Sequence, residues 1–99
     1  MTTLHSPSRT KKKTLHREIL ISLVNLSPPP NDDHPPPENT WAATRQIADA
    51  HDISIYKARL LLLELTHQGL VVVTDGPVNN SLRWYPDRAA IYRRQSMSE

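Results

Sequence analysis

The chain has 99 residues, of which 37% are hydrophobic and five are aromatic, so it can bury one small core and leaves no room for a second domain. Because it contains no cysteine, disulfide frameworks, zinc knuckles and iron–sulfur sites are excluded, and a reducing cytoplasmic location is expected. With two glycines and no recognisable pairing of nucleophile and base, the sequence predicts no enzymatic activity, no cofactor and no small-molecule substrate.

Charge is distributed unevenly along the chain, although the formal net charge is only +2. Residues 1–26 carry five basic side chains against Glu18 alone, whereas residues 27–40 carry three acidic side chains and no lysine or arginine. Residues 41–86 contain four basic and four acidic side chains and are formally neutral. No signal peptide is expected at the polar N-terminus, and apolar runs such as Leu60–Leu63 are far too short to span a bilayer, so no membrane contact is predicted.

Residues 1–13 are polar and basic, without apolar periodicity, and are expected to form a mobile arm. Lys11, Lys12 and Lys13 are candidates for phosphate contacts if the arm orders on DNA. A tail that serves only solubility is the alternative.

A first helix is expected from Thr14, its predicted N-cap, to the residues before Pro28, where helical geometry is disfavoured. Its apolar residues recur at spacings of three and four, which predicts one buried stripe. The stripe consists of Leu15, Ile19, Leu20, Leu23 and Val24.

Residues 27–40 hold six of the nine prolines in two triplets around an acidic centre, which predicts an extended loop of polyproline II character. A ligand for a proline-binding domain is the alternative, but the segment lacks a basic anchor. Residues 40–43, with Trp41 as a large anchor, then predict a short strand.

Thr44 is the expected N-cap of a short second helix from Arg45 to about His51, and Ser54 is the expected N-cap of a third, longer helix. At 100° per residue, four apolar side chains of this third helix fall in one arc and predict its core stripe. They are Ala58, Leu61, Leu62 and Leu65. Gly69 supplies the left-handed residue that ends the helix.

Two β-rich segments follow, Leu70–Thr74 and Ser81–Tyr85, joined by a turn at residues 75–80, with Pro86 ending the second. Three helices and a hairpin predict a winged helix-turn-helix, mainly α with a small β-hairpin, over residues 14–86. Residues 87–99 form a C-terminal tail in which Ala90, Ile91 and Arg94 have the spacing of a short helix.

A third helix that reads the major groove of DNA needs polar side chains on the outward face of its N-terminal half. Beside it, helix N-termini attract phosphates and a wing can contact the backbone or the minor groove. The candidate DNA-binding residues of the folded domain are Thr44, Arg45, Ser54, Tyr56, Lys57, Arg59, Asn79, Asn80 and Arg83.

Leu60 and Leu63 are expected on the same outward face, although the hairpin could cover Leu63. They indicate contact with a protein, since an exposed apolar surface is poorly suited to polar base edges. A protein-interaction winged helix without DNA contact is therefore one alternative, and a plasmid or phage repressor that acts alone as a dimer is another. The five histidines are scattered, and Glu64 with His67 has the spacing of a solvated helical pair, so no metal site is expected.

The residues of the second and third helices resemble the FaeA/PapI-like regulators of bacterial fimbrial operons. The residues that carry this resemblance are Thr44, Ile47, Ala48, Ala50, Ile53, Tyr56, Ala58, Arg59, the following leucines, Gly69, the pair Trp84–Tyr85, and Glu18–Leu20 in the first helix. The resemblance implies a small winged-helix co-regulator of phase variation that acts with the leucine-responsive regulatory protein, Lrp, at operator DNA with GATC sites. The proline-rich segment and the basic arm lie outside that family's pattern.

These expectations combine into a cytoplasmic, nucleoid-associated transcriptional regulator of a fimbrial operon that binds double-stranded DNA. Non-specific DNA affinity comes mainly from phosphate neutralisation, so a formally neutral winged helix should bind DNA weakly without the basic arm or an Lrp-like partner.

Overall fold

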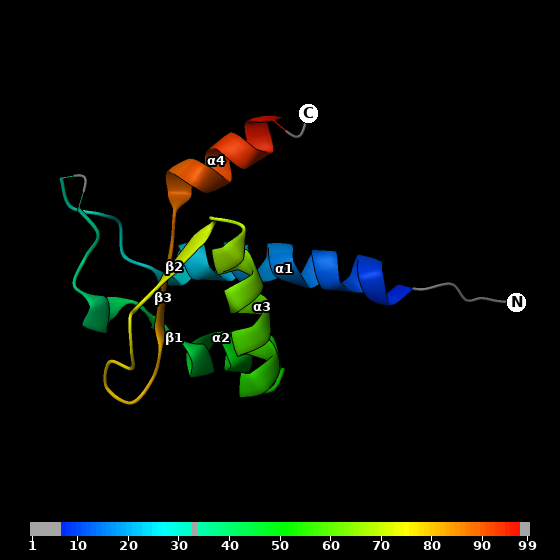
Figure 1. Cartoon of the computed structure of the whole chain (residues 1–99), viewed down its shortest axis with the longest axis horizontal. Coiled ribbons are helices and arrows are strands. Elements are labelled where there is room, and N and C mark those ends of the chain that lie inside the picture. Colours follow the sequence, from blue (N-terminus) through cyan, green and yellow to red (C-terminus); the bar gives the residue numbers. More distant parts are fainter. Residues whose placement is uncertain (1–6, 33, 98–99) are drawn as a thin grey trace, which may run out of the picture.

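The computed structural model describes residues 7–32 and 34–97, and over this range it confirms the predicted α+β architecture (Figure 1). These residues form four α-helices and a small three-stranded antiparallel sheet. The elements are α1 (Pro7–Leu26), the short 3-10 helix η1 (Glu38–Thr40), β1 (Ala42–Ala43), α2 (Thr44–Ala50), α3 (Ile55–His67), β2 (Val71–Val73), β3 (Arg83–Pro86) and α4 (Arg88–Met97).

Helix α1 begins at Pro7, well before the predicted start at Thr14, and ends at Leu26 before Pro28 as expected. Proline suits the first helical position because its amide is not needed there, and arginine and lysine are good helix formers. Thr14 is therefore an interior residue of α1 and not its N-cap. The backbone of residues 7–13 belongs to α1, whereas the side chains of Lys11, Lys12 and Lys13 lie outside the described part of the chain.

The proline-rich segment is a hairpin-like loop tied to the body of the protein. The amides and carbonyls of Asn31 and His34 exchange two hydrogen bonds, 2.8 and 2.7 Å long. Below this tip, the carbonyl of Pro36 accepts from Trp41 Nε1 at 2.9 Å, and that of Pro28 accepts from the Tyr85 hydroxyl at 2.7 Å. The segment is thus held at its two ends by aromatic side chains.

The sheet has the order β1-β3-β2, so β3 lies in its centre. The expected strands at 70–74 and 81–85 are shorter in the structure, and the expected strand at 40–43 is reduced to Ala42–Ala43 because Glu38–Thr40 form η1. At the tip of the wing, Val78 and Ser81 pair across Asn79 and Asn80, whose φ angles of 54° and 69° fit a type I′ turn.

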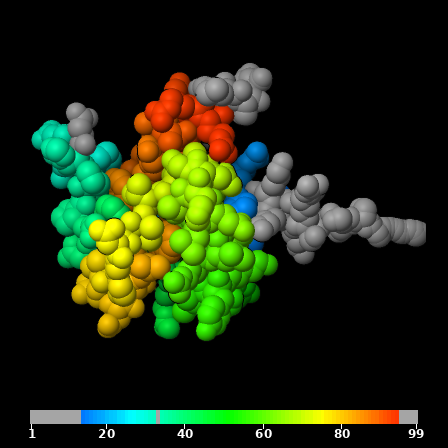
Figure 2. Space-filling model, viewed as in Figure 1, coloured from blue at the N-terminus to red at the C-terminus, as the bar shows by residue number. Residues whose placement is uncertain are grey.

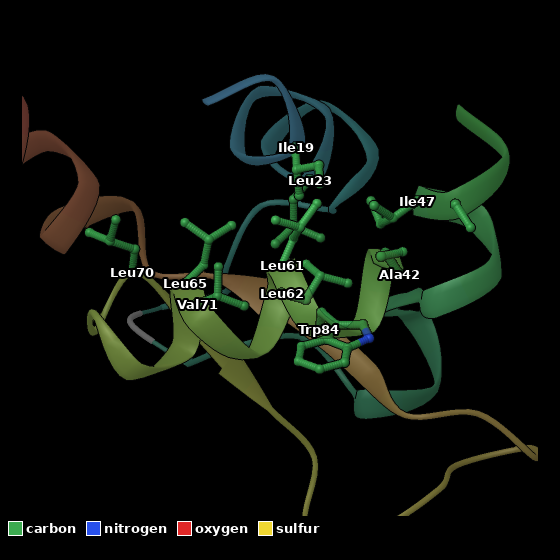
Figure 3. Close-up of a cluster of buried hydrophobic side chains, with 12 residues drawn as sticks. Ile19, Leu23, Ala42, Ile47, Leu61, Leu62, Leu65, Leu70, Val71 and Trp84 are labelled. Carbon is green, nitrogen blue, oxygen red and sulfur yellow. The ribbon is translucent and has the colours of Figure 1, made fainter. Parts of the chain in front are cut away.

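The core lies where α1, α2, α3 and the sheet meet (Figure 3). The predicted stripe of α3 is confirmed, since all four side chains are buried against the helices and the sheet. Trp84 on β3 is fully buried in this cluster, and Gly69 ends α3 with a φ of +79°.

Helix α4 confirms the short helix expected after Pro86 and docks onto the domain. Ala90 and Ile91 pack against the core, and Arg94 Nη1 donates to Gln68 Oε1 at 3.1 Å. Arg88, at the start of α4, donates to the carbonyls of Val24 and Ser27 near the end of α1. Among the described residues, no helix has both the length and the apolar character needed to cross a membrane.

Candidate nucleic-acid interface

The N-terminal half of α3 presents a polar and aromatic face to solvent. Ser54 caps the helix as expected, because its hydroxyl oxygen accepts a 3.0 Å hydrogen bond from the Lys57 amide. Tyr56 is 86% exposed, and Lys57 and Arg59 are exposed as well. These three side chains are therefore free to reach a ligand in front of the helix.

The two outward leucines of α3 differ in their surroundings. Leu60 is 53% exposed, so it lies on the open face as expected. Leu63 is half-buried and packs against the core cluster, so it is covered, as the alternative allowed, and does not lie on the open face. The exposed apolar side chains of α3 that could contact a partner protein are therefore Leu60 and Ile55.

A groove joins α3 to the start of α2 and to the wing. Arg45 from α2, Arg59 from α3 and Asn80 from the wing tip all line it, and so do Ile55 and Asp75. In Figure 2, α3 and the hairpin lie side by side on one face of the molecule. Three candidates from separate elements thus converge, and the acidic Asp75 in the same wall lowers the positive charge of this groove.

Thr44 has a different role from the one expected. It is the first residue of α2 and is buried, and its hydroxyl oxygen accepts a 2.8 Å hydrogen bond from Trp84 Nε1. At the N-terminus of α2, the side chain of Gln46 makes the capping contact, since its Oε1 accepts a 2.8 Å hydrogen bond from the Ala43 amide. The prediction that Thr44 is the N-cap of α2 is therefore wrong, because Ala43 holds that position and the Thr44 hydroxyl bonds Trp84. Thr44 still lines the groove, and its contact with a phosphate stays a prediction.

Arg83 is used within the wing. Its Nε donates to the carbonyl of Val78 at 3.0 Å, and its Nη1 donates to the carbonyl of Trp41 at 3.3 Å. These two bonds tie the hairpin to the segment before β1, and the contact of Arg83 with DNA stays a prediction. Asn79 and Asn80 at the tip are exposed.

Two histidines connect α1 to the helix-turn-helix. His16 Nε2 lies 2.8 Å from Glu64 Oε1 on α3, and His51 Nε2 lies 2.8 Å from the Ser22 hydroxyl. Glu64 therefore pairs with α1, in contrast to the local pair expected with His67, whose Nδ1 lies 3.1 Å from the carbonyl of Leu63. In the described part of the chain, no three His, Cys, Asp or Glu side chains are grouped so that they could hold a metal ion.

Sequence reasoning missed Ile55 and the cross-chain partners of Thr44 and Arg83. Ile55 follows Ser54 and carries no polar signal, although it lines the groove and is 45% exposed. The Thr44–Trp84 pair joins residues 40 positions apart, so no local spacing could indicate it.

A comparison with protein families identifies the family of this chain. The family model described as FaeA-like protein matches residues 15–76, which is more than half of the chain. The match begins at residue 15 within α1, extends into the wing, and ends before β3 and α4. No curated protein matches the chain. The chain therefore belongs to the FaeA-like family.

Proposed function

We propose that this protein is a DNA-binding transcriptional regulator of a fimbrial operon that works beside an Lrp-like protein at sites containing GATC. The single observation that carries the proposal is the convergence of Arg45, Arg59 and the wing tip on one groove beside the open face of α3. Family membership supports the fimbrial role, since the FaeA-like pattern is that of fimbrial regulators.

In this proposal the exposed half of α3 enters the major groove. Arg59 is suited to a bidentate hydrogen bond with a guanine, while Lys57 and Tyr56 contact neighbouring base edges or phosphates. The sugar-phosphate backbone beside α3 is contacted by Arg45 and by Asn79 and Asn80 at the wing tip. These contacts fix the position of α3 along the major groove. Ser54 can still donate its hydroxyl hydrogen to a phosphate while its oxygen caps α3.

The charge balance supports a need for a partner. Residues 41–86, which include α2, α3 and the wing, carry equal numbers of acidic and basic side chains, and Asp75 lines the proposed interface. Such a surface gains little from counterion release, so its affinity for duplex DNA alone is low. A DNA-bound partner raises the affinity by holding the protein close to its site.

Replacing Arg59 with alanine tests the contact at the groove. The variant should lose about 1–3 kcal/mol of operator binding in a gel-shift titration with the partner present, because one bidentate contact is removed. Arg93→Ala is the matched control, since it removes the same charge from an exposed position on α4. Equal loss in both variants would assign the effect to net charge and not to base recognition.

A second candidate function is a protein-docking winged helix that makes no DNA contact. It is favoured by the exposed apolar side chains Ile55 and Leu60, which flank Tyr56 and Arg59 on α3. Under this alternative, Leu60→Asp abolishes complex formation with the partner, whereas Lys57→Ala and Arg59→Ala change it little. A pull-down with these three variants in the absence of DNA separates the two functions.

A further inference from the structure

Helices α1 and α4 form the walls of a second groove, which shares no lining residue with the groove beside the wing. Its apolar lining comes from Leu20, Ile21 and Val24 on α1 and from Ile91 on α4. Arg17 and Asn25 provide the polar lining. The groove is an open surface built mainly from aliphatic side chains.

The apolar surface of α1 is wider than its contact with the core requires. Ile19 and Leu23 are fully buried in the core, and their stripe is the one that holds α1 on the domain. The α1 side chains that line the groove follow the neighbouring stripe at spacings of three and four. Leu20 on this stripe and Ile91 on α4 also pack partly against the core, whereas Ile21 is 55% exposed. A helix face that meets only water is normally polar, so this second stripe is suited to a partner.

The charges of the two walls select the kind of partner. Arg17 lines the groove next to the exposed Glu18 on α1, and Arg93 and Arg94 are exposed on α4, which has no acidic residue within Arg88–Met97. A second copy of this chain would place basic helices against basic helices, which costs energy at low salt. Duplex DNA would place its charged phosphates against the aliphatic side chains that line the groove, which is unfavourable. A partner helix with an apolar stripe and acidic side chains on both sides of it would match both the aliphatic lining and the basic side chains of the groove.

We propose that the groove between α1 and α4 binds an amphipathic helix of a partner protein, with its apolar stripe on Ile21 and Ile91 and its flanking acidic side chains toward Arg17 and the exposed arginines of α4. This is the helix-in-groove mode of recognition, in which apolar anchors recur at helical spacing. The surface is separate from the proposed DNA contact, so each can be lost without the other.

The probe is a labelled synthetic helix with leucines at helical spacing and glutamates on both flanks, prepared in several registers. A control helix of otherwise identical sequence carries lysines in place of the glutamates. Binding to the full chain is measured by fluorescence anisotropy, and amide chemical shifts locate the contact. The glutamate helices should bind more tightly than the lysine helices and shift Leu20, Val24 and Ile91.

Ile21→Glu is the disrupting variant, and Leu26→Glu is its matched control. Leu26 lies on the same helix and is 47% exposed, but it does not line the groove. Ile21→Glu should weaken the glutamate helices about tenfold or more, because it removes a buried aliphatic contact and adds a like charge. Leu26→Glu should leave binding within about twofold of the original. Since both positions are open to solvent, both variants should keep the circular dichroism and melting behaviour of the original protein.

Reversing one charge provides a readout that loss of folding cannot imitate. Arg17→Glu should weaken the glutamate helices and strengthen the lysine helices. Arg59→Ala should retain peptide binding while it loses operator binding, so failure of the DNA proposal and failure of this one are distinguishable.

Four results of the peptide measurements would overturn the proposal. They are equal binding of glutamate and lysine helices, no binding of glutamate helices in any register, equal damage by Leu26→Glu and Ile21→Glu, and release of the peptide by duplex DNA at low salt. Concentration-dependent self-association that Ile21→Glu abolishes would assign the groove to a second copy of the chain and would also overturn it.

Discussion

Replacing Arg88 with alanine should destabilise the whole domain, although Arg88 lies outside the segment that matches the family. Its guanidinium donates to the carbonyls of Val24 and Ser27 at 3.3 and 3.1 Å and to the Tyr85 hydroxyl at 3.0 Å. It also lies over the Tyr85 ring, 5.3 Å from the ring centroid. One side chain thus links the start of α4, the last turn of α1 and the central strand.

The expected loss follows from these contacts. Hydrogen bonds from a charged donor contribute about 1.5–3 kcal/mol each, and a cation–π contact about 0.5–2 kcal/mol. Because Arg88 is half-buried and its contacts are not independent, the total is about 2–4 kcal/mol, out of the 5–15 kcal/mol that holds a typical small domain together.

Urea unfolding followed by tryptophan fluorescence measures this loss, because Trp84 is buried within β3 and Trp41 is buried and stacks on Tyr85 of the same strand. Arg93→Ala, an exposed position on the same helix, is the control for the removal of charge. Arg88→Lys should recover only part of the loss, since an ammonium cannot span three acceptors. If Arg88→Ala and Arg93→Ala unfold at the same urea concentration, the reasoning about this link is refuted.

Three further changes test other parts of the account. Leu62→Ala should cost about 2–5 kcal/mol of unfolding free energy in urea, because the side chain is fully buried, and a loss below about 1 kcal/mol would contradict the core described here. Gly69→Ala should cost about 1 kcal/mol through its φ of +79° alone, since nothing lies within 4 Å of an added Cβ; an unchanged melting temperature would argue against this helix end. Deleting residues 1–13 should reduce the dependence of DNA affinity on salt while the domain stays folded, and identical salt slopes with and without them would exclude the arm from DNA contact.

Local sequence patterns predicted the parts of the fold that depend on neighbouring residues. The period of the apolar side chains in α3, the Ser54 cap and the Gly69 stop all concern contacts within a few positions, and the structure confirms them. The outward position of Tyr56 and Arg59 follows from the same period, since burial of one arc exposes the other.

Contacts between distant residues explain what the sequence could not predict. Thr44 is a residue type that often caps helices, but its hydroxyl oxygen accepts a hydrogen bond from Trp84 of β3. The proline-rich loop has the composition of a free linker, yet Trp41 and Tyr85 hold its ends, and their stacked rings lie 5.2 Å apart. Arg83 has the charge of a DNA contact, but the carbonyls of Val78 and Trp41 lie within its reach.

The central claim is that the face of α3 beside the wing reads operator DNA with the help of a partner. Titration of a fluorescent duplex containing GATC sites, with and without Lrp, tests it most directly. We expect weak, salt-sensitive binding by the protein alone, tighter binding when Lrp is present, and loss of that gain in Arg59→Ala. Binding that is equally tight without Lrp, or an Arg59→Ala variant that behaves as the original protein in both titrations, would contradict the claim.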